Sequence, residues 1–427
     1  MNGSITKKSR FAVSHNTIAN FAFIAYFSMP FIRMAIGFLR LSSIAYPIAF
    51  FITYVPVLLL VPVNREKANR LMEFGVLFIL LALILGVSLM IHPDYEYWFT
   101  RETYGVLPYI FRPDNGIYAF LFIRLVKNPN VILKNLRISG CLMYVYFLRQ
   151  LLNALSTGYW LNENAAGEMV QFSYSLDFGY SVLFFALVFL YLALRDKDIF
   201  DIGAAALGVA MILVGGSRGA VLCLGIFVVI YMLIAFQKSR RKFLYISIVA
   251  IVSVVIDMFY QPILYAVAAI MDRFNLPSRF IYKILEGSIT DGQGRDAIWN
   301  AAINMIKEKP LLGYGAMGAR PVISQYHNVG YPHNLFIEWF IEYGVIIGGI
   351  SAVLLVGVSI IIFVRKDLGE WRFVYVIAFA NACELMLSYT YWHKQALWIC
   401  IALFISIRGY CKRKKYDRLE ATERFIS

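Results

Sequence analysis

The stretch that decides the fold is "HNLFIEWFIEYGVIIGGISAVLLVGVSIIIFV", residues 333–364. After its first two residues it is apolar almost throughout, and its only charged side chains are Glu338 and Glu342. A helix needs about 20 apolar residues to cross the hydrocarbon core of a bilayer. The stretch therefore predicts a transmembrane helix that is tilted or extends past the bilayer.

Similar apolar runs recur along the whole chain of 427 residues. The composition is 60% hydrophobic and 15% charged, whereas a soluble domain is about half apolar and a quarter charged. The expected fold is all-α, a polytopic integral membrane helical bundle of about 12 spans. These are expected at 18–38, 43–62, 72–91, 113–126, 138–156, 173–194, 199–214, 218–236, 243–260, 333–364, 373–389 and 394–408.

The spans divide the chain into three parts. Residues 1–271 form a transmembrane bundle of nine expected spans, and residues 272–331 form a large extracytoplasmic loop containing short helices. Residues 332–427 hold spans ten to twelve and a basic cytoplasmic tail. Loops as long as 272–331 are uncommon without a function, so the chemistry is expected there.

The positive charges indicate an orientation. The net charge is +14, and most lysines and arginines fall on alternate inter-span segments and in the tail "RGYCKRKKYDR". By the positive-inside rule both termini are cytoplasmic. The tail is interpreted as an anchor near anionic lipid, and nucleic-acid binding is not expected. The N-terminal "KKSR" and the apolar stretch after it are interpreted as an uncleaved signal anchor. The five cysteines lack CxxC spacing and predict neither a disulfide framework nor a metal site.

Within the large loop, "GRDAIWNAAINMIKEKP" predicts a helix ended by its proline. Ile298, Ala302, Met305 and Ile306 share one apolar face. The helix is expected to lie along the membrane surface, with Trp299 at headgroup level. The following "GYGAMG", residues 313–318, lacks the strand context of a nucleotide-binding loop and is interpreted as a tight turn. "DKD" at 196–198 is interpreted as a solvated turn rather than a metal site.

Two arginines are candidates for binding phosphate. Arg218 opens an expected span in "VGGSRGAVLCLGIF", where a charged side chain near the membrane is costly and suggests function. It could instead extend to the lipid headgroups. Arg295 stands at the start of the loop helix, where free backbone N–H groups favour anions. It could equally be a solvated side chain at a helix start.

His333 is the candidate catalytic residue. A free histidine titrates near pH 6.5, so it can accept a proton at neutral pH as a general base. The alternative is a structural histidine that caps the expected span at 333–364. Asn334, Glu338 and a second histidine in "QYHN", His327, are weaker candidates.

Several charged residues fall within or beside the expected spans. Most are expected to pair inside the bundle or to lie at an interface, and some could line a cavity. Arg33 and Arg149 are retained as weaker site candidates, and Asp177, Asp257 and Glu384 complete this group.

The order of "GSRGAVL", "GRDAIWNAAINMIKEKPLLGYG" and "HNLFIEWFIEYGVIIGG" resembles the O-antigen ligase and polymerase superfamily of bacterial envelopes. The resemblance spans residues 210–350. In addition, "SYSLDFGYSVLF" at 173–184 is similar to polymerases of capsule or exopolysaccharide repeat units.

The resemblance implies a metal-independent glycosyl transfer, without a cofactor, on the outer face of the bacterial cytoplasmic membrane. The donor would be an oligosaccharide on polyprenyl pyrophosphate, held by Arg218 and Arg295. His333 would activate the acceptor hydroxyl, with inversion at the anomeric carbon. The implied partners are membrane lipids, a flippase and chain-length regulator proteins.

We favour a polymerase of repeat units because of the segment at 173–184 and the 28 tyrosines. One alternative is an O-antigen ligase that passes the finished glycan to a lipid acceptor, as in lipopolysaccharide. A second is a transporter or flippase of lipid-linked oligosaccharide, since twelve spans are also typical of transporters. Transporters often have two related halves, which this sequence does not show.

Overall fold

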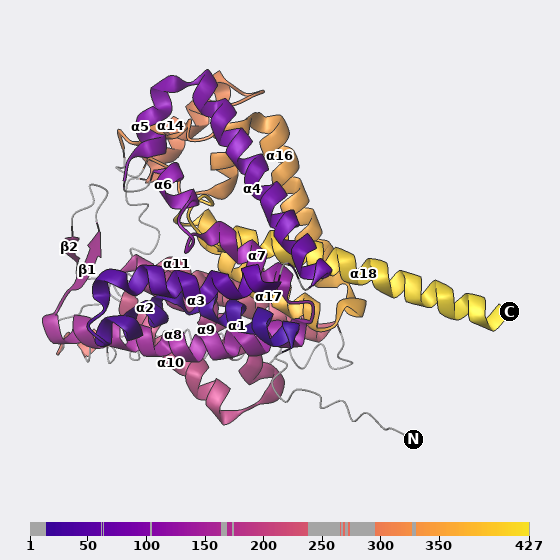
Figure 1. The fold of residues 1–427 in the computed structure, drawn as a ribbon. Coiled ribbons are helices and arrows are strands. Elements are labelled where there is room, and N and C mark those ends of the chain that lie inside the picture. The colour runs from indigo at the N-terminus through magenta and orange to yellow at the C-terminus, as the bar shows by residue number, and fades with distance from the viewer. Residues whose placement is uncertain are drawn as a thin grey trace.

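The computed structural model describes residues 14–60, 62, 64–102, 105–163, 169–172, 175–237, 265, 268–269, 272–273, 295–326 and 330–426. The described chain is a helical bundle with one small β-hairpin (Figure 1). The expectation of an all-α membrane fold is therefore confirmed at the level of class. The expected span at 243–260, with Asp257, and the candidate His327 lie outside the described residues.

The first half of the chain begins with a bent pair, α1 (His15–Phe27) and α2 (Met29–Phe38), whose axes differ by 77°. The long helices α3 (Ala45–Leu60), α4 (Arg65–Ile91) and α8 (Pro129–Thr157) follow. Short elements connect them: η1 (Ser42–Ile44), η2 (Pro93–Tyr95), α5 (Glu96–Thr100), α6 (Val106–Ile110), η3 (Gly116–Tyr118) and α7 (Ala119–Leu125).

The second half begins with the antiparallel hairpin of β1 (Trp160–Glu163) and β2 (Met169–Phe172), in which Trp160 pairs with Phe172. The helices that follow are α9 (Leu176–Asp196), α10 (Ile199–Gly215), α11 (Arg218–Phe236), α14 (Arg295–Glu308) and α15 (Arg320–Ile323). The chain ends with α16 (Leu335–Val364), η4 (Lys366–Leu368), α17 (Glu370–Ala382), η5 (Cys383–Met386) and α18 (Ala396–Ile426).

Helix α9 lies at the centre of the bundle and packs against α8, α10, α11 and α17. Ser175 begins it as an N-cap whose side chain accepts a hydrogen bond from the backbone N–H of Phe178. Most of its residues are buried, as expected of a helix that is apolar on all sides. Because lipid tails are as apolar as leucine, close packing stabilises such a core more than the exclusion of water does.

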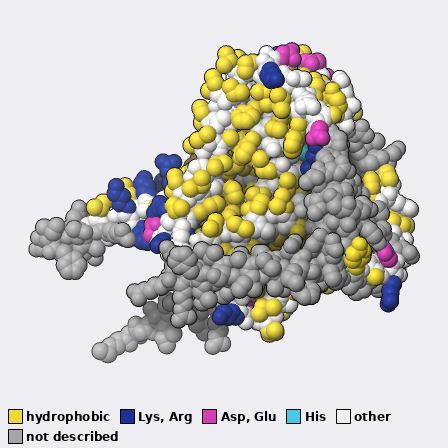
Figure 2. Space-filling model, turned by 180° about the vertical axis from the view of Figure 1, so that it is seen from behind, with side chains coloured by type: hydrophobic (Ala, Val, Ile, Leu, Met, Phe, Trp, Pro, Cys, Tyr) yellow, Lys and Arg dark blue, Asp and Glu magenta, His cyan; other side chains and the backbone are white. Residues whose placement is uncertain are grey.

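Six described helices are long and apolar enough to cross a membrane, or seven if α1 and α2 form one bent span. Three expected spans correspond to helices shorter than 18 residues, namely α7, α10 and α17. The total of twelve spans therefore stays a prediction. Hydrophobic side chains cover the upper and middle part of one face, with charged side chains at its edges (Figure 2). This surface is that of an integral membrane protein.

The apolar stretch at 333–364 is broken within α16. Gly344 has φ 73° and ψ 173°, which is not helical. Residues 310–315 pack into the break, where Tyr314 N–H donates to the Ile341 carbonyl at 2.7 Å and Val345 N–H donates to the Pro310 carbonyl at 2.7 Å. The apolar helix after the break, residues 345–364, is about 30 Å long at 1.5 Å per residue, which matches the hydrocarbon core of a bilayer. The part of α16 before the break carries Glu338 and Glu342, both buried.

The predicted loop helix is confirmed as α14, and Ile298, Ala302 and Met305 are buried. This face packs against α15 and the first part of α16, and the position of α14 along the membrane surface stays a prediction. The tight turn predicted at 313–318 is also confirmed, with Gly313 and Gly315 at positive φ. Asp198 of "DKD" caps α10 and pairs with Arg137 at 2.6 Å.

Candidate functional site

The turn before Arg218 is fixed by its neighbours. Gly216 ends α10 in the left-handed conformation with φ 72°. Ser217 is buried and caps α11 by accepting a hydrogen bond from the Ala220 N–H at 3.4 Å. Arg218, half-buried, is the first residue of α11. The Ser175 N–H donates to the Gly215 carbonyl at 3.1 Å, so this turn is joined to the start of α9.

Tyr180 connects the Arg218 turn with other parts of the chain. A Cβ added at Gly219 would lie 1.7 Å from the Tyr180 Oη, so the backbone next to Arg218 touches this phenol. Tyr180 Oη and Ser388 Oγ are 3.2 Å apart and share a hydrogen bond. The charge of Arg295 acts on the same hydroxyl. The backbone next to Arg218 therefore touches a buried tyrosine on whose hydroxyl the charge of Arg295, far away in the sequence, also acts.

Helix α14 places Arg295 near the segment that contains His333. Arg295 is the first residue of α14 and is half-buried. One turn later, the Trp299 Nε1–H donates to the Pro332 carbonyl at 3.1 Å. Trp299 therefore joins α14, at whose start Arg295 lies, to the segment that contains His333.

His333 is held in a conformation that few side chains adopt. Its φ is 54°, and its ring lies 4.6 Å from the Tyr331 ring in an edge-on contact. The capping role considered for it belongs to Asn334, whose Oδ1 accepts from the Phe336 N–H at 3.0 Å and the Ile337 N–H at 3.2 Å. Backbone strain of this kind costs about 1–3 kcal/mol and tends to cluster at functional sites.

A buried ionic network lies behind His333. Arg320 and Glu338 are each 1% exposed, with Arg320 Nη2 3.9 Å from Glu338 Oε1. The Thr390 hydroxyl donates to the same Glu338 oxygen at 2.7 Å. The Arg320 guanidinium also lies over the Tyr331 ring, 4.9 Å from its centroid, on which His333 packs. Sequence reasoning missed Arg320, although it is an arginine in the large loop near two other site candidates.

Glu342 joins three segments. Its Oε2 accepts from the Tyr391 hydroxyl at 2.6 Å, and its Oε1 accepts from the Met317 N–H at 3.0 Å. It therefore fixes the turn at 313–318 and the segment 387–395 against α16. Sequence reasoning also missed that segment, "LSYTYWHKQ", although a run of aromatic and basic residues between two spans is an available signal.

Cationic side chains gather on this side of the bundle. His393 is half-buried and packs on the Tyr109 ring at 4.3 Å. Loss of surrounding water lowers the pKa of His393 well below its ordinary value, and nearby positive charges lower it further. These charges belong to Arg320, Lys394, Arg101 and Arg112. Three of them lie beside carboxylates: Arg112 beside Asp114, Arg320 beside Glu338 and Lys394 beside Asp177.

Beside Tyr180 lies a polar cavity of about 150 Å³. It is lined by Asp114, Gly116, Tyr180, Ser181, Phe184, Asn381, Glu384, His393, Lys394 and Gln395. Among its polar atoms, Asn381 Oδ1 is buried and has no hydrogen-bond partner among the described residues. Among all the residues that the structure describes, no three His, Cys, Asp or Glu side chains are arranged to hold a metal ion.

The weaker candidates Arg33 and Arg149 lie elsewhere. Arg33 is 3.7 Å from Asp114 in an ion pair, and Arg149 lies over the Phe38 ring at 4.6 Å. The charges of both act on the Tyr146 hydroxyl. Through Asp114, Arg33 reaches the lining of the polar cavity beside Tyr180, whereas Arg149 is not among the residues that line it.

A comparison with protein families matches residues 203–351 to the family described as O-antigen ligase. The matched range includes Arg218, Arg295, Arg320 and His333. A search of curated proteins found no match to this chain.

Proposed function

We propose that this chain, whose residues 203–351 match the family described as O-antigen ligase, polymerises oligosaccharide repeat units carried on polyprenyl pyrophosphate. It is a membrane enzyme of the glycosyltransferase kind, and its products would be O-antigen, capsule or exopolysaccharide. The proposal is carried by three observations: the backbone next to Arg218 touches Tyr180, the charge of Arg295 acts on the same hydroxyl, and Trp299 of α14 donates to Pro332, the residue before His333.

The proposed chemistry needs two kinds of group. The acceptor hydroxyl attacks the anomeric carbon of the donor, and the bond from that carbon to the pyrophosphate oxygen breaks. His333 takes the proton of the attacking hydroxyl as general base. Arg218 and Arg295 stabilise the negative charge that develops on the departing polyprenyl pyrophosphate, to which a guanidinium can donate two parallel hydrogen bonds. Attack from the face opposite the leaving group inverts the anomeric configuration.

The surrounding cations support this assignment. Arg320 and Lys394 act on His393 and are each paired with a carboxylate, and fixed charges act strongly where water is excluded. The site lies on the outer face in the topology predicted from the charge distribution, where a carrier-linked glycan would be presented after export. A flippase and chain-length regulator proteins are the proposed partners of such an enzyme.

The test uses purified protein in lipid nanodiscs and a synthetic polyprenyl-pyrophosphate repeat unit, without nucleotide sugar. A ladder of longer carrier-linked glycans is the expected result. Transfer that begins only when a core lipid acceptor is added would identify a ligase instead. Movement of the lipid-linked glycan across a vesicle membrane, with no new glycosidic bond in either assay, would reject the enzyme and favour a transporter.

A further inference from the structure

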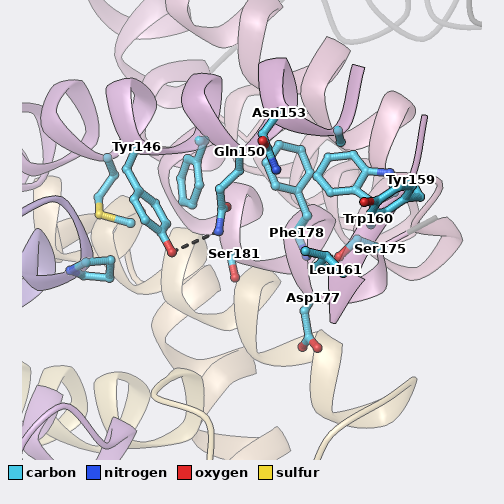
Figure 3. A pocket seen from close by; sticks show the side chains of 14 residues that line it. Tyr146, Gln150, Asn153, Tyr159, Trp160, Leu161, Ser175, Asp177, Phe178 and Ser181 are labelled. Carbon is cyan, nitrogen blue, oxygen red and sulfur yellow. Dashed lines mark hydrogen bonds between the residues drawn. The ribbon is translucent and has the colours of Figure 1, made fainter. Parts of the chain in front are cut away.

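A cavity of about 290 Å³ lies between α8, the start of α9 and strand β1 (Figure 3). Its volume is at the lower end of the range of about 300–1,000 Å³ for small-molecule sites. Figure 3 shows Tyr146, Gln150 and Asn153 following α8, with Ser181 and Asp177 on α9. Its walls are completed by Pro30, Met143, Phe147, Ala154, Tyr159, Trp160, Leu161, Ser175 and Phe178.

The wall combines aromatic rings with amide groups. Tyr159, Trp160 and Phe178 supply rings, and Trp160 packs on Phe178 with 4.6 Å between centroids. Trp160 is only 5% exposed, yet its Nε1–H has no hydrogen-bond partner among the described residues. A buried indole N–H usually has a hydrogen-bond partner, so a ligand with an acceptor at this position would supply the missing one.

Side-chain amides supply the remaining polar groups. The Gln150 amide donates to the Tyr146 hydroxyl at 2.9 Å, which orients the side chain and leaves its carbonyl oxygen as an acceptor. Asn153, one turn further along α8, is exposed on the same wall. Each amide can donate and accept.

This combination matches a sugar. A pyranose ring has an apolar face of C–H groups, which stacks on an aromatic ring, and hydroxyls at its rim that both donate and accept. A purely apolar ligand would leave the amides and the Trp160 N–H unpaired, which costs free energy. A phosphate would lack a contact that uses the rings.

The cavity is adjacent to the proposed reaction site. Ser181 lines both this cavity and the polar cavity beside Tyr180. Asp177 lies 3.5 Å from Lys394 Nζ, which lines the polar cavity. The start of α9 is also bonded to the turn before Arg218. A glycan with its pyrophosphate near Arg218 could therefore extend into the larger cavity.

We propose that the cavity between α8, α9 and β1 binds one sugar residue of the glycan substrate, as a subsite beside the arginines. This inference rests on the proposed function. The subsite recognises sugar hydroxyls and a ring face, and it contributes to the choice of repeat unit.

The test measures binding of a glycan that has no carrier. The probe is the oligosaccharide released by mild acid from the lipid-linked pool of the producing cells, titrated into the full-length protein in nanodiscs by isothermal calorimetry. Asn153→Ala and Trp160→Phe are expected to raise its Kd about tenfold, and the double variant by more. Asn130→Ala, on an exposed position at the other end of α8, is the matched control and should bind as the unchanged protein does.

Equal Kd values for all variants, or no binding of the glycan to the unchanged protein, would overturn the subsite. Arg218→Ala separates this test from that of the reaction, because it should abolish transfer while the carrier-free glycan still binds. If transfer fails on every donor but binding still depends on Asn153, the proposed reaction is wrong and the subsite stands. With donor and acceptor varied separately, a raised KM for one of them in Asn153→Ala shows which substrate fills the cavity, and an unchanged KM for both overturns the proposal.

Discussion

Replacing Gly344 by alanine should disconnect the His333 segment from the membrane-spanning part of α16. A Cβ at this position would lie 2.1 Å from the Leu311 carbonyl oxygen, and the backbone has φ 73°. A side chain in that conformation costs about 1–3 kcal/mol. Moving residues 310–315 away would also weaken the hydrogen bonds at the break, at about 0.5–1.5 kcal/mol each. The free energy of unfolding should fall by about 2–5 kcal/mol from these two effects.

Gly357→Ala is the matched control, because it lies in the same helix with nothing within 4 Å of the added Cβ. Alanine is favoured over glycine in a helix by about 1 kcal/mol, so this variant should be neutral or slightly more stable. Both would be followed by thermal unfolding in detergent and by glycan elongation. We expect a lower melting temperature and little activity for Gly344→Ala alone. Identical curves and equal activity for the two variants would refute the argument that the break positions the site.

Three further predictions follow from the contacts around the site. Gly219→Ala should lower the elongation rate about 100-fold, because the added methyl group would displace the Tyr180 phenol. Gly225→Ala, which has open space around it, should leave the rate unchanged. Equal rates in the two variants would contradict this prediction. Arg320→Met should lower the free energy of unfolding by about 3–5 kcal/mol, because Glu338 would lose its buried cation. Adding Glu338→Gln should restore much of this loss. If the effects of the two substitutions simply add in denaturant unfolding, the two side chains do not interact. The pKa of His393 is lowered in the folded protein, so the unfolded chain binds a proton at this residue more readily. The melting temperature should therefore fall as the pH drops below about 6.5, and less steeply in His393→Gln. The same dependence of melting temperature on pH in both proteins would show that His393 is not the cause.

The apolar periodicity predicted most helices because each span must satisfy its own backbone hydrogen bonds. It also predicted α14, whose buried positions follow the helical repeat. It could not predict the break in α16, since Gly344 is one of several glycines in that stretch and the hydrogen bonds from residues 310–315 come from a distant turn. The hairpin after α8 is too short to give a periodic pattern.

For the site, the sequence motifs alone identified Arg218, Arg295 and His333 as candidates. The contacts of Tyr180 with the backbone next to Arg218, and of Trp299 with the residue before His333, are tertiary contacts that no local sequence pattern encodes. Arg320 was missed for the same reason, because its partner Glu338 appears in the sequence only as an acid within an apolar helix. The basic tail was predicted as an anchor near lipid, but its continuation of α18 to Ile426 was not foreseen.

The most direct test of the account is single-turnover elongation of a polyprenyl-pyrophosphate repeat unit by purified protein in EDTA, without nucleotide sugar. The unchanged protein should form a new glycosidic bond of inverted anomeric configuration, read by NMR of the product. Arg218→Ala, Arg295→Ala and His333→Ala should each lower the rate at least 100-fold, while Asn130→Ala should not. Full activity in any one of the first three variants, or a product with retained configuration, would contradict the mechanism proposed for these residues.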